Sequence, residues 1–196
     1  LEKSMSLLER EAVKRVRGAL IEAGLEDTVI ELTDTARSAK DAANAIECEL
    51  GAIVKSLVFN IDQRFVMALV AGDHKCLEKS LPTALSLEGK VGRPKANEVK
   101  AITGFTIGGI APIGMTACLP MVIDRSLQRF DTIYAAAGHP RCVFPIAFAD
   151  LQLITEAIVS FNIAAPLDSL SVDAPGLASS KIFNEGHESR HIGATE

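Results

Sequence analysis

Residues 53–71 read IVKSLVFNIDQRFVMALVA. β-Branched and aromatic residues dominate both halves of this stretch, which predicts two strands, Ile53–Ile61 and Arg64–Ala71. Only Asp62 and Gln63 separate the two halves, and this short spacing is typical of a β-hairpin. Both faces of the first strand are largely apolar, so we expect it to lie in the centre of a sheet.

Lys55 is unusual in this strand. Strand alternation places Ile53, Lys55, Leu57 and Phe59 on one face, so the lysine is directed among large apolar side chains. A buried lysine is rare unless it has a partner. Two readings stay open: the side chain reaches solvent along apolar surface at the strand end, or its ammonium points into a pocket and binds a phosphate or carboxylate.

The rest of the chain alternates between helical and strand patterns. Helices are predicted over residues 4–23, from Ser38 to about Glu49, over 94–103 and over Phe148–Thr155. Further strands are predicted over Thr28–Leu32, Leu119–Asp124, Thr132–Ala137 and Val143–Ile146. The mixture predicts an α/β (α+β) domain, and the hairpin argues against a purely parallel sheet. We expect one domain over residues 1–165, with an N-terminal helix within 1–24, and a C-terminal tail over 166–196.

Charge restricts the class of partner. The chain has 20 Lys and Arg residues against 25 Asp and Glu residues, for a net charge of -5. A free-standing reader of duplex DNA normally has a basic excess, so we expect no DNA partner. Residues 36–100 alone are net positive, and the window 89–97 carries Lys90, Arg93 and Lys95 with no acid. This window is either solvated surface or a phosphate-facing patch.

Residues 101–123 carry no charge, which raises the question of a membrane span. Glycines and prolines interrupt the stretch repeatedly, so we expect a buried loop and no membrane partner. Four cysteines lie scattered with no C-x-x-C pair, as is typical of a reduced cytosolic chain. The first twenty residues carry eight charges and no apolar run, so we expect no signal peptide and a cytoplasmic location.

The sequence GGIAPIG at residues 108–114 is a candidate binding loop. Glycines let a backbone approach a ligand closely, and free N–H groups there would polarise a carbonyl. The alternative is an ordinary glycine-rich turn between strands. The loop matches neither the P-loop nor the G-x-G-x-x-G motif, and we expect no cofactor.

Of two histidine motifs, we interpret one as a candidate site and the other as a chance match. His139 follows the apolar run Ile133–Ala137, at a strand end where sites are often built, although a surface-loop histidine is the alternative. Residues 187–191 read HESRH, which satisfies the zinc-protease pattern H-E-x-x-H. That pattern requires a helix and a third ligand, whereas Gly186 and Gly193 bracket it here, so we interpret it as a chance match and expect no metal.

In order along the chain, these motifs resemble one family. They are TARSAKDAA (35–43), IVKSLVF (53–59), AGD (71–73), Lys95-Ala96, TGFTIGG (103–109), PIG (112–114), IDRSL (123–127) and AGHP (137–140). With their spacing, they resemble the YbaK / prolyl-tRNA-synthetase-associated editing-domain family over roughly residues 25–165. The resemblance implies a mixed, mostly antiparallel sheet wrapped by helices.

The resemblance also implies a function. Family members hydrolyse the ester between a wrong amino acid and its tRNA, as free-standing deacylases or as insertion domains of prolyl-tRNA synthetases. This length leaves no room for a synthetase body, so we expect a free-standing trans-editing hydrolase that binds the acceptor end of a mischarged tRNA. We expect a tRNA(Pro)-type or related substrate with a small wrong amino acid. A non-catalytic tRNA- or nucleotide-binding module of the same fold is the alternative, and a homodimer stays open.

Site residues follow from the same resemblance. The expected catalytic residues are Lys55, Gly108, Gly109 and His139. The expected substrate-binding residues are Ser56, Pro112, Gly114, Gly138 and Lys95. In this hypothesis the lysine anchors the phosphate or ribose of the terminal adenosine, backbone N–H groups of the 108–114 loop stabilise the oxyanion, and the histidine positions the substrate. Ribose hydroxyls of the substrate take part in proton transfer.

Overall fold

The computed structural model describes residues 6–33, 36 and 38–170 of the chain. Its α-helices are α1 (Glu11–Glu22), α2 (Ala39–Ile46), α3 (Leu81–Ala84), α4 (Ala96–Thr103) and α5 (Phe148–Thr155). Its strands are β1 (Ile30–Glu31), β2 (Ile53–Ile61), β3 (Arg64–Ala71), β4 (His74–Cys76), β5 (Val91–Gly92), β6 (Met121–Asp124), β7 (Ile133–His139), β8 (Cys142–Ile146), β9 (Ile158–Ser160) and β10 (Ala164–Pro166).

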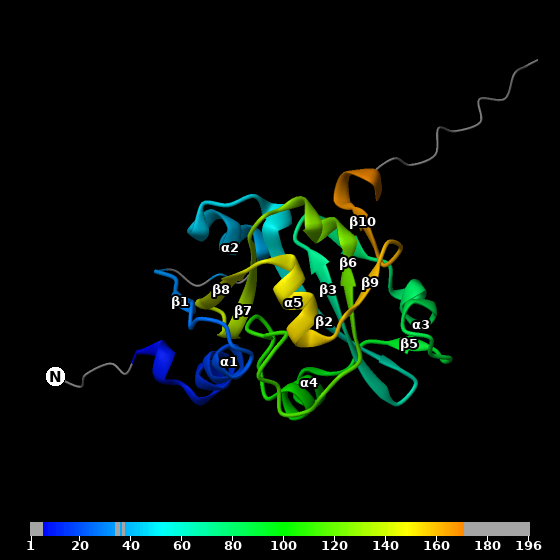
Figure 1. The fold of residues 1–196 in the computed structure, drawn as a ribbon. Coiled ribbons are helices and arrows are strands. Elements are labelled where there is room, and N and C mark those ends of the chain that lie inside the picture. Colours follow the sequence, from blue (N-terminus) through cyan, green and yellow to red (C-terminus); the bar gives the residue numbers. More distant parts are fainter. Residues whose placement is uncertain (1–5, 34–35, 37, 171–196) are drawn as a thin grey trace, which may run out of the picture.

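The main sheet has the strand order β1-β8-β7-β2-β3-β6-β9, and β5 adds to β2 (Figure 1). The pairings β1–β8, β7–β8, β2–β3 and β2–β5 are antiparallel, whereas β2–β7, β3–β6 and β6–β9 are parallel. A separate antiparallel pair joins β4 to β10. The predicted fold class is therefore confirmed, and β2 is the central strand that its two apolar faces predicted.

The β2–β3 hairpin follows the predicted boundaries. Its register runs from Val54 opposite Ala71 to Ile61 opposite Arg64, with a two-residue turn between the strands. Asp62 takes a positive φ of 51° in this turn, a conformation that aspartate tolerates better than most residues.

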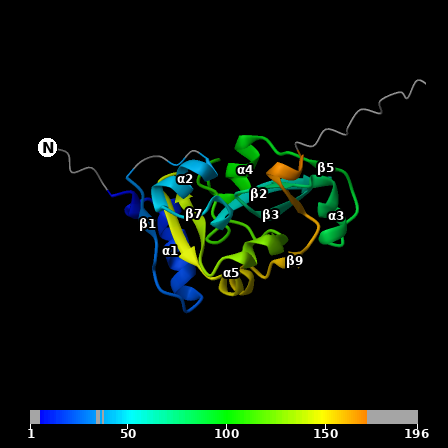
Figure 2. The ribbon, with the colours of Figure 1, turned by 90° about the horizontal axis from the view of Figure 1, so that it is seen from above.

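Each face of the hairpin belongs to a different core. Met67, Leu69 and Ala71 face a cluster that includes residues of α1 and α5, whereas Val66 and Val70 face a cluster that includes residues of α3. Figure 1 shows α5 in front of the sheet, and Figure 2 shows α5 and α4 on opposite sides of the hairpin. The hairpin thus connects the two halves of the hydrophobic core.

Three predicted helices are shorter than expected. α1 begins at Glu11, because a separate 3-10 turn over Leu7–Glu9 ends at Arg10, whose backbone is extended. α2 ends at Ile46, because Glu47 takes a left-handed conformation.

α4 begins at Ala96, two residues after Pro94. The Glu98 carboxylate accepts the Lys95 N–H ahead of this helix, and Gly104 ends it with a φ of 75°. The predicted glycine end is confirmed, but the predicted proline start is wrong.

The short strands β4, β5, β9 and β10 were not predicted, whereas β1 lies within the predicted strand Thr28–Leu32. β4 and β10 each have three residues and pair with one another, and the 3-10 segment Leu167–Leu170 follows β10. Ordered structure therefore extends past residue 165, into the range that we expected to be a tail. Residues 171–196 lie outside the described part of the chain.

The uncharged stretch after α4 is a folded loop. Between Gly104 and Pro120 the structure has no helix or strand, and Phe105, Ala111 and Ile113 are buried there. The following strand begins at Met121, two residues later than predicted. Within the described residues, no helix combines the length and the apolar character that crossing a membrane requires.

Candidate active site

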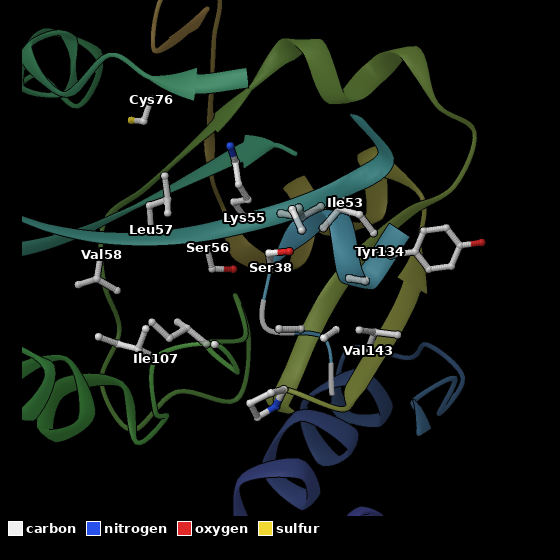
Figure 3. A pocket seen from close by; sticks show the side chains of 18 of the residues that line it. Ser38, Ile53, Lys55, Ser56, Leu57, Val58, Cys76, Ile107, Tyr134 and Val143 are labelled. Carbon is white, nitrogen blue, oxygen red and sulfur yellow. The ribbon is translucent and has the colours of Figure 1, made fainter. Parts of the chain in front are cut away.

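A cavity of about 580 Å³ lies beside β2. Four of the predicted site residues line it: Lys55, Ser56, Gly108 and His139. They come from β2, from the loop after α4 and from the end of β7, so the sheet topology brings together residues that are far apart in sequence. Figure 3 shows Lys55 and Leu57 on the same face of β2 as Cys76, and Ser56 and Val58 on the opposite face, with Ile107.

The Lys55 ammonium is held by backbone carbonyls. Its Nζ donates to the carbonyl oxygens of Gly72 and His74, which flank Asp73 in the turn between β3 and β4. Burial lowers the pKa of Lys55, and nearby acidic groups, Asp73 foremost, oppose this shift. An ammonium has three donors, so one N–H of Lys55 stays available to a ligand in the cavity.

Asp73 fixes the turn that holds Lys55. Arg129 Nη2 donates to both carboxylate oxygens, at 2.9 and 3.0 Å, and His74 Nδ1 lies 2.6 Å from Oδ1. Burial alone would raise the pKa of Asp73, but the hydrogen bonds from His74 and Arg129 outweigh it and lower the pKa. The Asp73 carbonyl also accepts the N–H of Leu167 at 3.0 Å, which joins the turn to the segment after β10.

Ser56 has the opposite character. Its hydroxyl oxygen is buried and has no hydrogen-bond partner among the described residues. A buried polar atom without a partner is uncommon, and in a cavity wall it indicates a place where a ligand supplies the missing bond.

Gly108 lies in a tight turn that faces the cavity. The Gly109 N–H donates to the Thr106 carbonyl at 3.0 Å, and Gly108 has a φ of 95°, as the third residue of a type II turn requires. A Cβ at position 109 would lie 2.8 Å from the His139 backbone. Gly109 therefore lets the loop lie directly against β7, and its N–H is already used. Within the described structure, the Gly108 N–H has no acceptor.

His139 is fixed in one orientation. Its Nδ1 accepts the N–H of Arg141 at 3.1 Å, so in the neutral ring the proton is on Nε2. Burial lowers the pKa of His139, and the positive charges of Arg10 and Arg141 add to this effect. The imidazole is therefore neutral near pH 7 and offers a single N–H donor.

The remaining predicted residues do not line the cavity. Gly114 and Gly138, with φ of 70° and 83°, pack against the backbone of α1, where a Cβ would meet α1 backbone atoms at 2.8 Å or less. Pro112 is buried in the same loop, and Lys95 is exposed at the start of α4. Of the basic window at 89–97, Arg93 lines the cavity and pairs with Glu78.

The two ends of the cavity are lined by different side chains. Beside α2, the wall combines the small side chains of Ala36, Ala39, Ala42 and Ala136 with the larger ones of Ile53, Tyr134 and Val143 (Figure 3). At the other end, beside α4, the apolar side chains of the wall are those of Leu57, Val58, Val99, Ile107 and Ile110. The same cavity wall carries Lys55, Ser56, Gly108 and His139, together with Ser38, His74, Lys75 and Arg93. The wall beside α2 is therefore largely apolar and mixes small and large side chains.

No thiolate is offered by the two buried cysteines of the cavity wall. Burial raises the pKa of Cys76 and of Cys142 to about 11, so both are thiols near neutral pH. Within the described residues, no cluster of three or more His, Cys, Asp or Glu side chains could hold a metal ion. The H-E-x-x-H sequence at 187–191 lies outside that part of the chain.

Most of the cavity lining was not among the predicted site residues, and three of the missed residues are informative. Ile107, 63 % exposed, and Leu167, 45 % exposed, are large apolar side chains at the cavity wall, and Lys75 lies there on β4. Only Ile107 had a local signal, because a residue ahead of two glycines is a favoured turn position. Leu167 and Lys75 depend on the β4–β10 pairing, which no local pattern indicated.

Comparisons with known proteins agree on one family. The sequence profile of the aminoacyl-tRNA editing domain matches residues 33–154. A Bacillus subtilis protein of uncharacterized function, YwhH, is 30 % identical over 128 residues, which cover 65 % of this chain and 80 % of YwhH. A proline–tRNA ligase from Bacillus velezensis is 28 % identical over 134 residues, which cover 63 % of this chain and 24 % of the ligase.

A solved structure has the same fold. The crystal structure of a candidate trans-editing enzyme for prolyl-tRNA synthetase superposes with a TM-score of 0.72 at 34 % identity. The match covers 78 % of this chain and 96 % of that protein. This chain thus spans nearly the whole of that protein but only about a quarter of the ligase.

Proposed function

The chain belongs to the aminoacyl-tRNA editing domain family, and we propose that it is a trans-editing hydrolase that deacylates mischarged aminoacyl-tRNA. Water attacks the ester carbonyl, the tRNA leaves with its free hydroxyl, and the amino acid leaves as its carboxylate. The substrate is a tRNA(Pro)-type or related molecule that carries a small wrong amino acid. The proposed place of action is the cytoplasm.

One observation carries this proposal: a single cavity presents Lys55, Ser56, Gly108 and His139 together. An aminoacyl ester is already activated, so its hydrolysis chiefly needs a positioned water and a stabilised oxyanion. The unpaired N–H of Gly108 is suited to the oxyanion, and such a donor is typically worth about 3 kcal/mol. The free N–H of Lys55 anchors the ribose or phosphate of the terminal adenosine, and His139 Nε2–H positions the substrate.

The wall beside α2 is where we place the amino acid side chain of the substrate. Ile53, Tyr134 and Val143 limit the space that Ala36, Ala39, Ala42 and Ala136 leave open, so we place a methyl or hydroxymethyl side chain there rather than a larger one. One methylene changes discrimination by about 1–3 kcal/mol in a hydrophobic pocket, so selectivity among small amino acids will be graded rather than absolute.

Two exposed cationic side chains line the same cavity as the proposed catalytic residues. Lys75 and Arg93 line the cavity and are exposed, so they are placed to meet phosphates of the acceptor end. A few phosphate contacts give weak, salt-sensitive binding. Such binding is what we expect of a chain with a net negative charge that contacts only the single-stranded end of a tRNA.

A panel of charged tRNAs tests the proposal. The tRNA specific for proline is charged separately with Ala, Ser, Cys, Thr and Pro, and the rate of amino acid release is measured with wild type, Lys55→Ala and Lys100→Ala. Lys100 is an exposed lysine on α4 and serves as the matched control. We expect faster release for at least one small amino acid than for Pro, lost in Lys55→Ala and kept in Lys100→Ala. If no substrate is released above the uncatalysed rate but tRNA still binds, the protein is a binding module.

A further inference from the structure

β2 has an open edge inside the cavity. On one side it pairs with β3 along its whole length, from Val54 to Ile61. On the other side it pairs with β7 only at Ile53 and Val54, and with β5 only at Asn60 and Ile61. Between these two short ladders, residues 55–59 have no strand partner on that side anywhere in the described chain.

The two neighbouring strands leave β2 for identifiable reasons. β7 loses its regular register after Ala136, where its pairing with β8 is interrupted before His139. On the other side, the β5 register places residue 94 opposite Val58, and residue 94 is a proline. Proline has no N–H to donate, so the ladder ends there. The register shift in β7 and the proline after β5 both lie beside the cavity.

The register identifies which backbone groups are open. In a hairpin with a two-residue turn, the residues that flank the turn, here Ile61 and Arg64, form a hydrogen-bonded pair. Alternate residues of β2 then direct their N–H and C=O groups away from β3. The Asp62 N–H donates to the Lys90 carbonyl on that far side at 2.9 Å, which agrees with this alternation. The peptide groups of Ser56 and Val58 therefore point into the gap between β7 and β5.

The open groups form an adjacent acceptor and donor. Along a strand edge, the carbonyl of one residue and the N–H of the residue two positions later lie side by side, here Ser56 C=O and Val58 N–H. Leu57 lies on one side of the sheet plane and Val58 and Ile107 on the other (Figure 3). A flat ring that enters this gap would be covered on both faces by apolar side chains and would meet an acceptor and a donor at its edge.

Adenine has the complementary edge. Its N6 amino group donates, and its neighbouring N1 accepts. We propose that the open edge of β2 binds the base of the terminal adenosine of the tRNA, with Ser56 C=O accepting from N6 and Val58 N–H donating to N1. This inference rests on the proposed function, because it takes the acceptor end as the ligand. It directs the ester toward Lys55 and Gly108 and the amino acid toward the wall beside α2.

Two mononucleotides test the base site without requiring catalysis. Inosine monophosphate (IMP) has an N1–H donor and an O6 acceptor, so it reverses the edge pattern of adenosine monophosphate (AMP). In titrations of ¹⁵N-labelled protein, we expect AMP to shift the Val58 amide resonance and to bind roughly tenfold more tightly than IMP, as for a matched two-bond contact. Equal affinities, or shifts confined to the surroundings of Lys75 and Arg93, would overturn the base site and leave only phosphate binding.

A pair of variants isolates the backbone donor. Val58→Pro removes the N–H that points away from β3, whereas Val58→Ala keeps it and loses only the side chain. We expect the preference for AMP over IMP to vanish in the first variant and to persist in the second. Circular dichroism verifies that each variant is folded, and the wild-type titration decides the question by itself if Val58→Pro does not fold.

The reaction separates this inference from the proposed function. An alanyl-tRNA that ends in adenosine is compared with one that ends in inosine. We expect the inosine substrate to have a KM roughly tenfold higher with little change in kcat. Hydrolysis of both at the same KM refutes the base site and keeps the hydrolase, whereas hydrolysis of neither, with the preference for AMP intact, refutes the hydrolase and keeps the base site.

Discussion

Lys55 and Ser56 are neighbours in β2 but have opposite surroundings. Lys55 donates to two backbone carbonyls in a turn that Asp73, His74 and Arg129 hold in place. Ser56, on the other face of the strand, has a buried hydroxyl with no partner in the described structure. A polar group that the fold satisfies contributes to stability, whereas a buried group left unsatisfied costs about 1–3 kcal/mol. The comparison teaches that the fold uses the polar group of Lys55 but not that of Ser56, which is why we propose that a ligand satisfies Ser56.

The largest expected effect comes from removing the Lys55 ammonium, which contributes to the fold and, in our proposal, to substrate binding. Lys55→Met keeps the length of the side chain but leaves the carbonyls of Gly72 and His74 without their donor. We expect kcat/KM for deacylation to fall roughly 100-fold, because a hydrogen bond to a charged group is worth about 1.5–3 kcal/mol. Urea unfolding should show a loss of about 1–3 kcal/mol for the same reason. A variant with wild-type activity and stability would remove Lys55 from both roles.

Ser56→Ala should lower the activity without lowering the stability. Removing a buried hydroxyl that has no partner in the fold should leave the free energy of unfolding unchanged or raise it by up to about 1 kcal/mol. If a ligand satisfies the hydroxyl, kcat/KM should fall roughly fivefold to tenfold, as for loss of one neutral hydrogen bond. Ser56→Cys, nearly equal in size, is the control for packing. Lower stability together with unchanged activity would show that Ser56 belongs to the fold.

His139 gives an effect that depends on pH. Its pKa is lowered in the fold, so the unfolded chain binds a proton first as the pH falls below about 6.5. The stability that the neutral ring contributes is therefore complete above pH 6.5 and is lost as the pH falls toward the folded pKa. His139→Asn, which keeps an acceptor for the Arg141 N–H but does not titrate, should not show this loss. Thermal melts of both proteins between pH 7.5 and 5.0 test the difference, and parallel curves would contradict it.

His139→Gln completes the pair in the deacylation assay. Glutamine places its amide near the position of Nε2, whereas asparagine mimics Nδ1. If Nε2–H positions the substrate, Gln should retain more activity than Asn, by roughly threefold to tenfold. The reverse order would show that His139 acts only through Arg141.

The smallest expected effect concerns the exposed cations of the cavity wall. Lys75→Ala should weaken tRNA binding roughly threefold at low salt and reduce the slope of log K against log salt by less than about one unit. Lys79→Ala, an exposed lysine that does not line the cavity, is the control. An unchanged salt slope in Lys75→Ala would show that phosphates do not reach this side of the cavity.

The sequence predicted the parts that local patterns encode. The β2–β3 hairpin has nine and eight residues of strand pattern around a short turn, and helix α5 matches its predicted bounds. Lys55 was identified because a charge in an apolar strand is conspicuous, and Gly108 because paired glycines are. The strands β4, β5, β9 and β10 have two or three residues each, too few for a period, and their partners lie far away in sequence.

Within the site too, only the features encoded in local sequence patterns were predictable. The open edge of β2 depends on where β5 and β7 end, and the support of Lys55 depends on the turn beside β4. Neither is visible in a local window, because each depends on which segments pair across the sheet. Gly114 and Gly138 show the converse: their glycines were identified, but their close contacts are with α1 rather than with the cavity.

The pairing of β4 with β10 also determines how late in synthesis the site is completed. The His74 carbonyl that holds Lys55 belongs to a strand whose partner, Ala164–Pro166, lies near the end of the described chain. Leu167 then bonds to the Asp73 carbonyl in the same turn. Contacts between such distant segments form late in folding. On the ribosome, the turn that holds Lys55 would therefore be fixed only after β10 has emerged. A chain that is not yet synthesised as far as β10 would lack the complete site.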